Sequence, residues 1–167
     1  MAIYKRFAIG ATRRESTMLR ARDVADYFLT RVDEEVGDSL SNLKLQKLVY
    51  YAQGFHLANY HKPLFQEPIE AWEHGPVVPE LYHAFKQHGA ASIPPPDSFN
   101  PKRFSPRTVE LLDEVYSVFG QFSAWKLRNM THAEPPWRDA YETESKVISH
   151  DSMRRYFGSL LTDVSKS

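Results

Sequence analysis

LKLQKLVYYAQGFHLANY, residues 43–60, is the most strongly patterned segment of the chain, and it sets the architecture. At 100° per residue its apolar side chains form two stripes on opposite faces of a helix. The first stripe contains Leu45, Leu48, Val49, Ala52 and Phe55, and the second contains Leu43, Tyr50 and Leu57. A helix that is apolar on two faces is buried between layers or keeps one face for a partner. We expect the buried arrangement, with Gly54 in the second stripe allowing another backbone to come close.

Further helical patterns lie on both sides of this segment. Serines and prolines in capping positions mark several of their starts, and glycines mark several of their ends. The expected helices cover residues 20–36, 79–89, 105–120, 123–134 and 153–161. Between them, Pro63 and Pro68 punctuate an extended or two-stranded element near 63–73, and Gly75-Pro76 predicts a turn. The fold class is therefore mostly α, a single compact helical domain with one short extended element.

The pattern also divides the chain. Residues 1–17 show no regular period and carry an excess of basic residues, which is typical of a mobile arm. Residues 18–162 form the expected domain, and 163–167 form a tail. The proline-rich stretch 90–106 is interpreted as an internal loop.

Composition restricts the classes of function. Lys+Arg 21 against Asp+Glu 21 gives a formal net charge of +0, which disfavours binding of nucleic acid by charge alone. With Cys 0, the chain has no thiolate nucleophile and no cysteine ligand for zinc. No apolar run reaches the 18 or so residues of a membrane span. We therefore expect a protein of the cytoplasm with no membrane partner.

The search for catalytic residues leaves one candidate pair. The histidines have neither the i, i+4 spacing nor the motifs of a metal site, and no glycine-rich phosphate loop is present, so we expect no metal and no cofactor. His132 and Glu134 lie close together before Pro135-Pro136, which leaves a His/Glu-dependent hydrolase or nuclease as an alternative. In the structural alternative, this segment is a helix end and Trp137 fills the core. Lys44 and Lys47 are interpreted as a solvated helix edge.

Three blocks of sequence carry a family resemblance. They are LKLQKLVYYAQGFHLA (43–58), IEAWEHGPVVPELYHAFKQHG (69–89) and MTHAEPPWRDAY (130–141). Their order and spacing closely resemble the Panacea family, also called the SocA-like antitoxin domain, over roughly residues 19–161.

The resemblance implies a non-enzymatic antitoxin of a bacterial toxin–antitoxin pair that neutralises a cognate toxin by direct binding. One family member delivers its toxin to the protease ClpXP, so the resemblance also raises an adaptor role. A DNA-binding autoregulator stays open as a further alternative. From their chemistry and their place in the blocks, we expect the partner-binding residues to be Leu43, Tyr50, Leu57, Trp72, His74, Gly75, Pro76 and Tyr82.

Overall fold

The computed structural model describes residues 18–165 of the 167, with side chains described as far as residue 161. The basic arm expected at 1–17 lies outside these residues, as does the end of the expected tail, 166–167. The proposed division into arm, domain and tail therefore stays a prediction.

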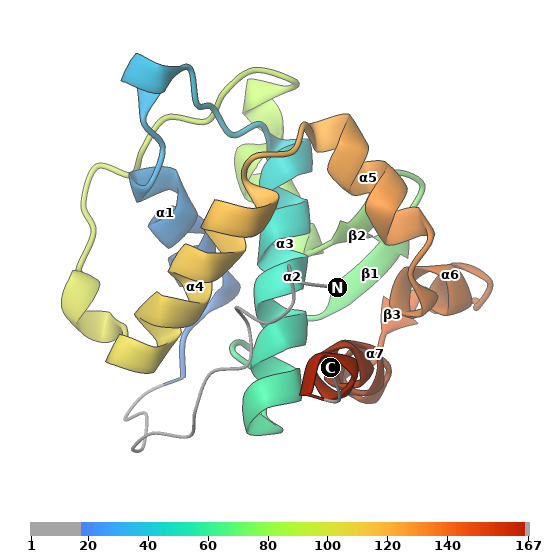
Figure 1. Cartoon of the computed structure of the whole chain (residues 1–167). Helices are drawn as coiled ribbons and strands as arrows, with labels where there is room; N and C mark the ends of the chain where they lie inside the picture. The colour runs from blue at the N-terminus through green and yellow to red at the C-terminus, as the bar shows by residue number, and fades with distance from the viewer. Residues whose placement is uncertain (1–17, 166–167) are drawn as a thin grey trace.

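Helix α2 (Asn42–Tyr60) runs through the middle of the molecule, and the other elements surround it (Figure 1). It contacts helices α1, α3, α4, α5 and α7 and strand β2. The Ser41 hydroxyl caps its start by accepting from the backbone N–H of Lys44 at 3.3 Å, and His61 in the left-handed conformation ends it. Side chains on both of its faces are buried, which confirms the buried arrangement.

The surrounding helices follow the sequence pattern closely. They are α1 (Ala21–Thr30), α3 (Pro79–Phe85), α4 (Pro106–Phe119), α5 (Ala124–His132), α6 (Pro135–Tyr141) and α7 (His150–Ser165). Short 3₁₀ turns lie at η2 (Glu34–Val36), η3 (Lys86–His88) and η4 (Pro101–Arg103). The helix expected over 20–36 is shorter than predicted, because Asp33 turns extended and its carboxylate accepts from the N–H of Glu35.

A small antiparallel sheet lies beside α2, with strand order β2-β1-β3. Its strands are β1 (Ile69–Trp72), β2 (Gly75–Val77) and β3 (Val147–Ile148). Trp72 pairs with Gly75, so the hairpin turn consists of residues 73 and 74. The turn predicted at Gly75-Pro76 is therefore displaced, because these two residues begin β2. The two-residue strand β3 was not predicted.

Helix α7 closes the core with an aromatic side chain. The Phe157 ring packs on Tyr50, Tyr51 and Phe55 with centroid separations of 5.5, 6.0 and 4.7 Å. A Cβ atom at Gly54 would overlap this ring. Gly54 thus makes room for a side chain of α7, whereas the sequence predicted the close approach of another backbone at this position.

Together these elements confirm a mostly α fold with one small sheet. Among the described residues, no helix has both the length and the apolar character needed to cross a membrane.

Candidate functional site

The three sequence blocks meet inside the molecule around Glu134, at the start of α6. The hydroxyl of Tyr50 donates to Glu134 Oε1 at 3.0 Å, and that of Tyr51 donates to Oε2 at 2.8 Å. Burial raises the pKa of the Glu134 carboxyl to about 7, although the two tyrosine hydrogen bonds act in the opposite direction. The carboxyl group therefore links α2 to α6 in a site that water barely reaches.

Lys47 occupies the neighbouring part of this interior. Its side chain is fully buried, and its Nζ donates to the carbonyl oxygen of Pro76 at 3.2 Å. Burial lowers the pKa of Lys47 to about 7, and the nearby positive charge of Arg128 lowers it further. The sequence interpretation of Lys47 as part of a solvated edge is wrong, because the hairpin and α5 cover this face of α2.

Gly75 is required where the hairpin crosses Lys47. Its φ of +110° is one that L side chains rarely adopt. A Cβ atom there would lie 2.5 Å from Cε of Lys47 and 2.9 Å from Oγ1 of Thr131. Glycine thus allows β2 to pass directly over the lysine and α5.

Two further contacts tie the hairpin to the helices. The backbone N–H of Val78 donates to Oε1 of Gln46 at 2.9 Å. The indole N–H of Trp137 donates to the backbone oxygen of Trp72 at 2.8 Å. The residues shared by the three blocks therefore hold the β1–β2 hairpin in a fixed position against α2 and α6.

His132 and Glu134 have separate partners. The His132 ring stacks on Trp137 with centroids 3.8 Å apart and bonds to the backbone of Glu73, and burial lowers its pKa. Both carboxylate oxygens of Glu134 are taken by the buried tyrosines. Among the described residues, no group of three or more His, Asp or Glu side chains is placed to hold a metal ion.

An open groove lies on the outer side of the same hairpin. It measures about 440 Å³, between the start of α2, the hairpin and the end of α3. Its lining residues are Asn42, Leu43, Gln46, Trp72, Glu73, His74, Val77, Tyr82, Lys86, Gly89 and Ala90. The rings of Trp72 and Tyr82 meet edge to face with centroids 5.0 Å apart. We call this the hairpin groove.

The hairpin groove brings together four of the eight residues expected to bind a partner. Leu43, Trp72, His74 and Tyr82 line it, and His74 and Tyr82 are exposed. The other four expected residues are buried, namely Tyr50, Leu57, Gly75 and Pro76. Helix α7 packs over Tyr50, and Gly75-Pro76 begin the buried strand β2, so a partner contact by these four residues stays a prediction.

Trp125 is a surface residue that the sequence analysis assigned only to a helix. Its side chain on α5 is 54% exposed, and its ring lies 5.8 Å from that of His74. The guanidinium of Arg128, one turn further along α5, lies 4.6 Å over the indole. The i, i+3 spacing of Trp125 and Arg128 is the only sequence signal that could have indicated this pair.

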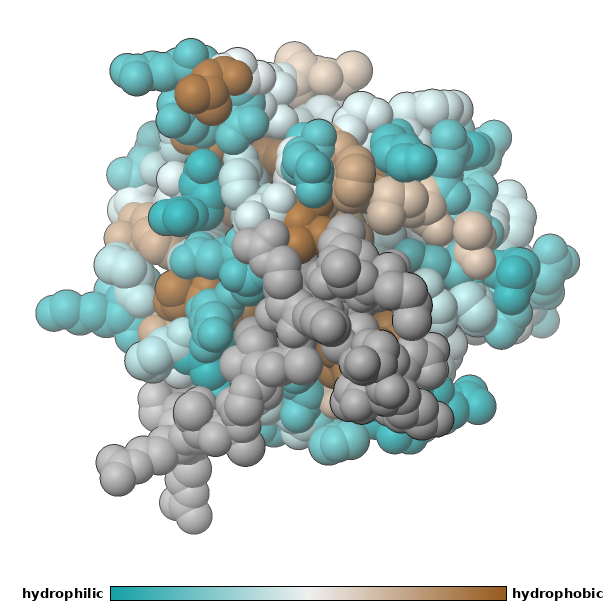
Figure 2. Space-filling view, in the orientation of Figure 1, coloured by the Kyte–Doolittle hydropathy of each residue, from teal (hydrophilic) through white to brown (hydrophobic). Residues whose placement is uncertain are grey.

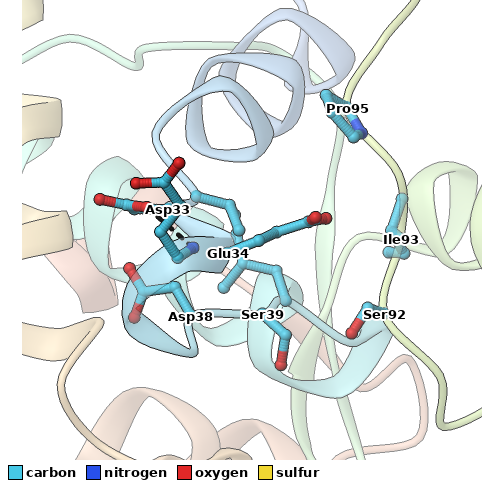
Figure 3. Close-up of a pocket in the computed structure, with 10 residues that line it drawn as sticks. Asp33, Glu34, Asp38, Ser39, Ser92, Ile93 and Pro95 are labelled. Carbon is cyan, nitrogen blue, oxygen red and sulfur yellow. Dashed lines mark hydrogen bonds between the residues drawn. The ribbon is translucent and has the colours of Figure 1, made fainter.

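Other parts of the described surface have scattered hydrophobic areas and an acidic pocket. On the face drawn in Figure 2, hydrophobic residues lie in small separate areas among hydrophilic ones. A second pocket of about 490 Å³ has Asp33 and Asp38 on one side and Ile93 and Pro95 on the other (Figure 3). The carboxylate of Asp33 accepts from the N–H of Glu35, and that of Asp38 accepts from the hydroxyl of Tyr116 at 3.1 Å. These acidic groups stabilise the local structure.

Comparison with known proteins gives two matches. The family described as "Antitoxin SocA-like, Panacea domain" matches residues 45–138, a range that includes most of the three blocks. Antitoxin SocA of Caulobacter vibrioides (strain NA1000 / CB15N) is 41% identical over 73 residues, which are 44% of this chain and 38% of that relative. The match thus spans well under half the length of the relative. No solved structure matches the chain.

Proposed function

The chain belongs to the SocA-like Panacea family, and from this premise we propose that it is an antitoxin that neutralises a cognate toxin by direct binding. The hairpin groove is the proposed contact surface, with Leu43, Trp72, His74 and Tyr82 as its toxin-binding residues.

The observation that carries the proposal is the convergence of these four residues, from two separate blocks of sequence, on one open groove. Tryptophan and tyrosine at the centre of an interface contribute most to binding, because they bury a large area with few rotatable bonds. The interior contacts of Lys47, Gln46 and Trp137 fix the hairpin that forms one wall. A wall held in this way loses little conformational entropy on binding, which favours affinity.

The same geometry supports a binding role over an enzymatic one. A general acid or base needs access to its substrate, and both oxygens of Glu134 are engaged inside the protein. The formal net charge of +0 supports a protein partner over a DNA-binding autoregulator. The cytoplasm is the proposed location.

Coexpression tests the proposal. The open reading frame adjoining this gene is expressed alone and with this chain, and growth and co-purification are scored. Growth arrest that this chain relieves, with both proteins eluting together, is the expected result. Absence of arrest, or arrest that this chain does not relieve, would overturn the proposal.

Delivery of the bound toxin to ClpXP is the finer version of the mechanism. It predicts that the toxin half-life shortens only when this chain and ClpXP are both present. A pulse-chase in strains with and without ClpX measures this directly. An equal half-life in all strains would leave masking of the toxin as the mechanism.

A further inference from the structure

The polar groups at the floor of the hairpin groove are already hydrogen-bonded within the protein. Gln46 bonds through Oε1 to the N–H of Val78 and through Nε2 to Asn42, and Asn42 donates to the carbonyl oxygen of Tyr82 at 3.2 Å. The remaining floor is the apolar side chains of Leu43 and Val77. A polar ligand would find few free hydrogen-bonding groups there, whereas an apolar side chain would displace water favourably.

A cation that forms no ion pair with the described residues lies directly beside this groove. His74 lines the groove, Trp125 contacts His74, and the guanidinium of Arg128 stacks over Trp125. Among the described residues, Arg128 forms no ion pair, its Nη1 donates to Oδ1 of Asn129 at 3.0 Å, and its Nε is buried. A guanidinium stacked on an indole can still donate to a carboxylate from its outer N–H groups, and Nη2 is the group left for this contact.

The surrounding charges favour an anion at this point. Burial lowers the pKa values of both Lys47 and His132, and the positive charge of Arg128 lowers them further, so Arg128 lies within electrostatic range of both groups. Lys86 lines the groove at the end of α3 and has no ion pair among the described residues. Of the described residues that line the groove, Glu73 alone carries a carboxylate. A partner with acidic side chains therefore complements this rim.

We propose that the groove takes an apolar side chain of the toxin, and that Arg128 binds an acidic side chain of the toxin next to that anchor. The inference rests on the proposed antitoxin function and specifies the chemistry of its partner segment. The apolar anchor supplies affinity in the groove, and the carboxylate fixes the orientation of the segment across His74 and Trp125.

Binding of the purified product of the adjoining open reading frame tests this inference. Arg128→Glu is expected to weaken binding by about tenfold or more, and Arg128→Gln by less, because reversal adds repulsion to the lost ion pair. Leu43→Asn makes the groove polar without adding charge. The loss of binding caused by Leu43→Asn is expected to be the same at about 50 and about 300 mM salt. The loss caused by Arg128→Glu is expected to be smaller at the higher salt concentration.

Lys102→Glu is the matched control, since Lys102 is exposed on η4 and changes the net charge by the same amount. Thermal unfolding of each variant checks that it folds. If Arg128→Glu does not fold, Arg128→Gln provides the test. This inference alone would be overturned if neither Arg128 variant weakened binding to the toxin. It would also be overturned if Lys102→Glu weakened binding as much as Arg128→Glu does. No binding by the wild type would overturn the antitoxin function as well. Binding to the DNA upstream of this gene is measured as well. If the wild type binds this DNA and Arg128→Glu abolishes that binding, the cations at the groove serve nucleic acid and the inference is overturned.

Discussion

Replacing Glu134 by alanine tests the interior contacts that join α2 to the start of α6. Glu134→Ala removes the acceptor of two buried hydroxyl groups, those of Tyr50 and Tyr51. Both tyrosines are almost fully buried, so water cannot replace the carboxylate without opening the core. The substitution also leaves a cavity beneath the start of α6.

The expected loss follows from these contacts. Each unpaired hydroxyl costs about 1–3 kcal/mol, so together with the lost packing we expect roughly 3–5 kcal/mol. At about 2–4 °C per kcal/mol for a chain of this size, the unfolding temperature falls by about 10 °C. The loss is larger at pH 6 than at pH 8, because ionisation of the buried carboxyl already destabilises the wild type above its pKa of about 7.

Urea unfolding followed by circular dichroism measures this change. Glu80→Ala is the control, since Glu80 forms an exposed ion pair with Arg20 and its loss costs about 1 kcal/mol or less. Adding Tyr50→Phe and Tyr51→Phe to Glu134→Ala should recover part of the loss, because the unpaired hydroxyls are then gone. A Glu134→Ala variant as stable as Glu80→Ala at pH 6 would refute the reasoning.

Three further changes in stability are expected. Gly75→Ala should destabilise the chain by about 2 kcal/mol or more in thermal unfolding, because its φ is +110° and its new Cβ meets Cε of Lys47 at 2.5 Å; a loss below about 0.5 kcal/mol contradicts this. Stability should fall from about pH 4.5 to 7, where the folded state holds more protons on Glu134, and rise from about 7 to 10.5, where it holds fewer on Lys47. Urea unfolding across this range should therefore show a minimum near pH 7, with Glu134→Gln flattening the acid arm and Lys47→Met the alkaline arm. Gly54→Ala should lower the unfolding temperature because its Cβ overlaps an aromatic ring of α7. Gly158→Ala should not lower it, because its new Cβ meets no atom within 4 Å beyond the neighbouring backbone of its own helix.

Local signals predicted the helices well. Ser41, Ser105 and Ser123 each cap the helix that follows, because capping depends on residues only a few positions apart. Strand β3 escaped prediction because two residues are too short for a period and its partner Ile69 lies far along the chain. Lys47 was misjudged for a related reason, since its burial is imposed by the hairpin.

The site was predictable in part. Leu43, Trp72 and Tyr82 line one groove, as their chemistry suggested. Tyr50 belongs to the same apolar stripe of α2 as Leu43, but α7 packs over Tyr50 and buries it, while Leu43 lines the groove. Trp125 was not predicted, because a single exposed aromatic on a helix closely resembles a core residue in sequence, and only its i, i+3 spacing to Arg128 distinguishes it.

Growth rescue by a groove variant tests the central claim most directly. Tyr82→Ala removes one aromatic wall of the hairpin groove, while Val36→Ala removes exposed apolar surface from η2, away from the groove. Each variant is coexpressed at matched levels with the adjoining open reading frame, and growth and co-purified toxin are measured. We predict that Val36→Ala rescues growth as the wild type does, and that Tyr82→Ala loses both rescue and most of the bound toxin. Full rescue and normal co-purification by Tyr82→Ala would contradict the groove as the toxin-binding surface.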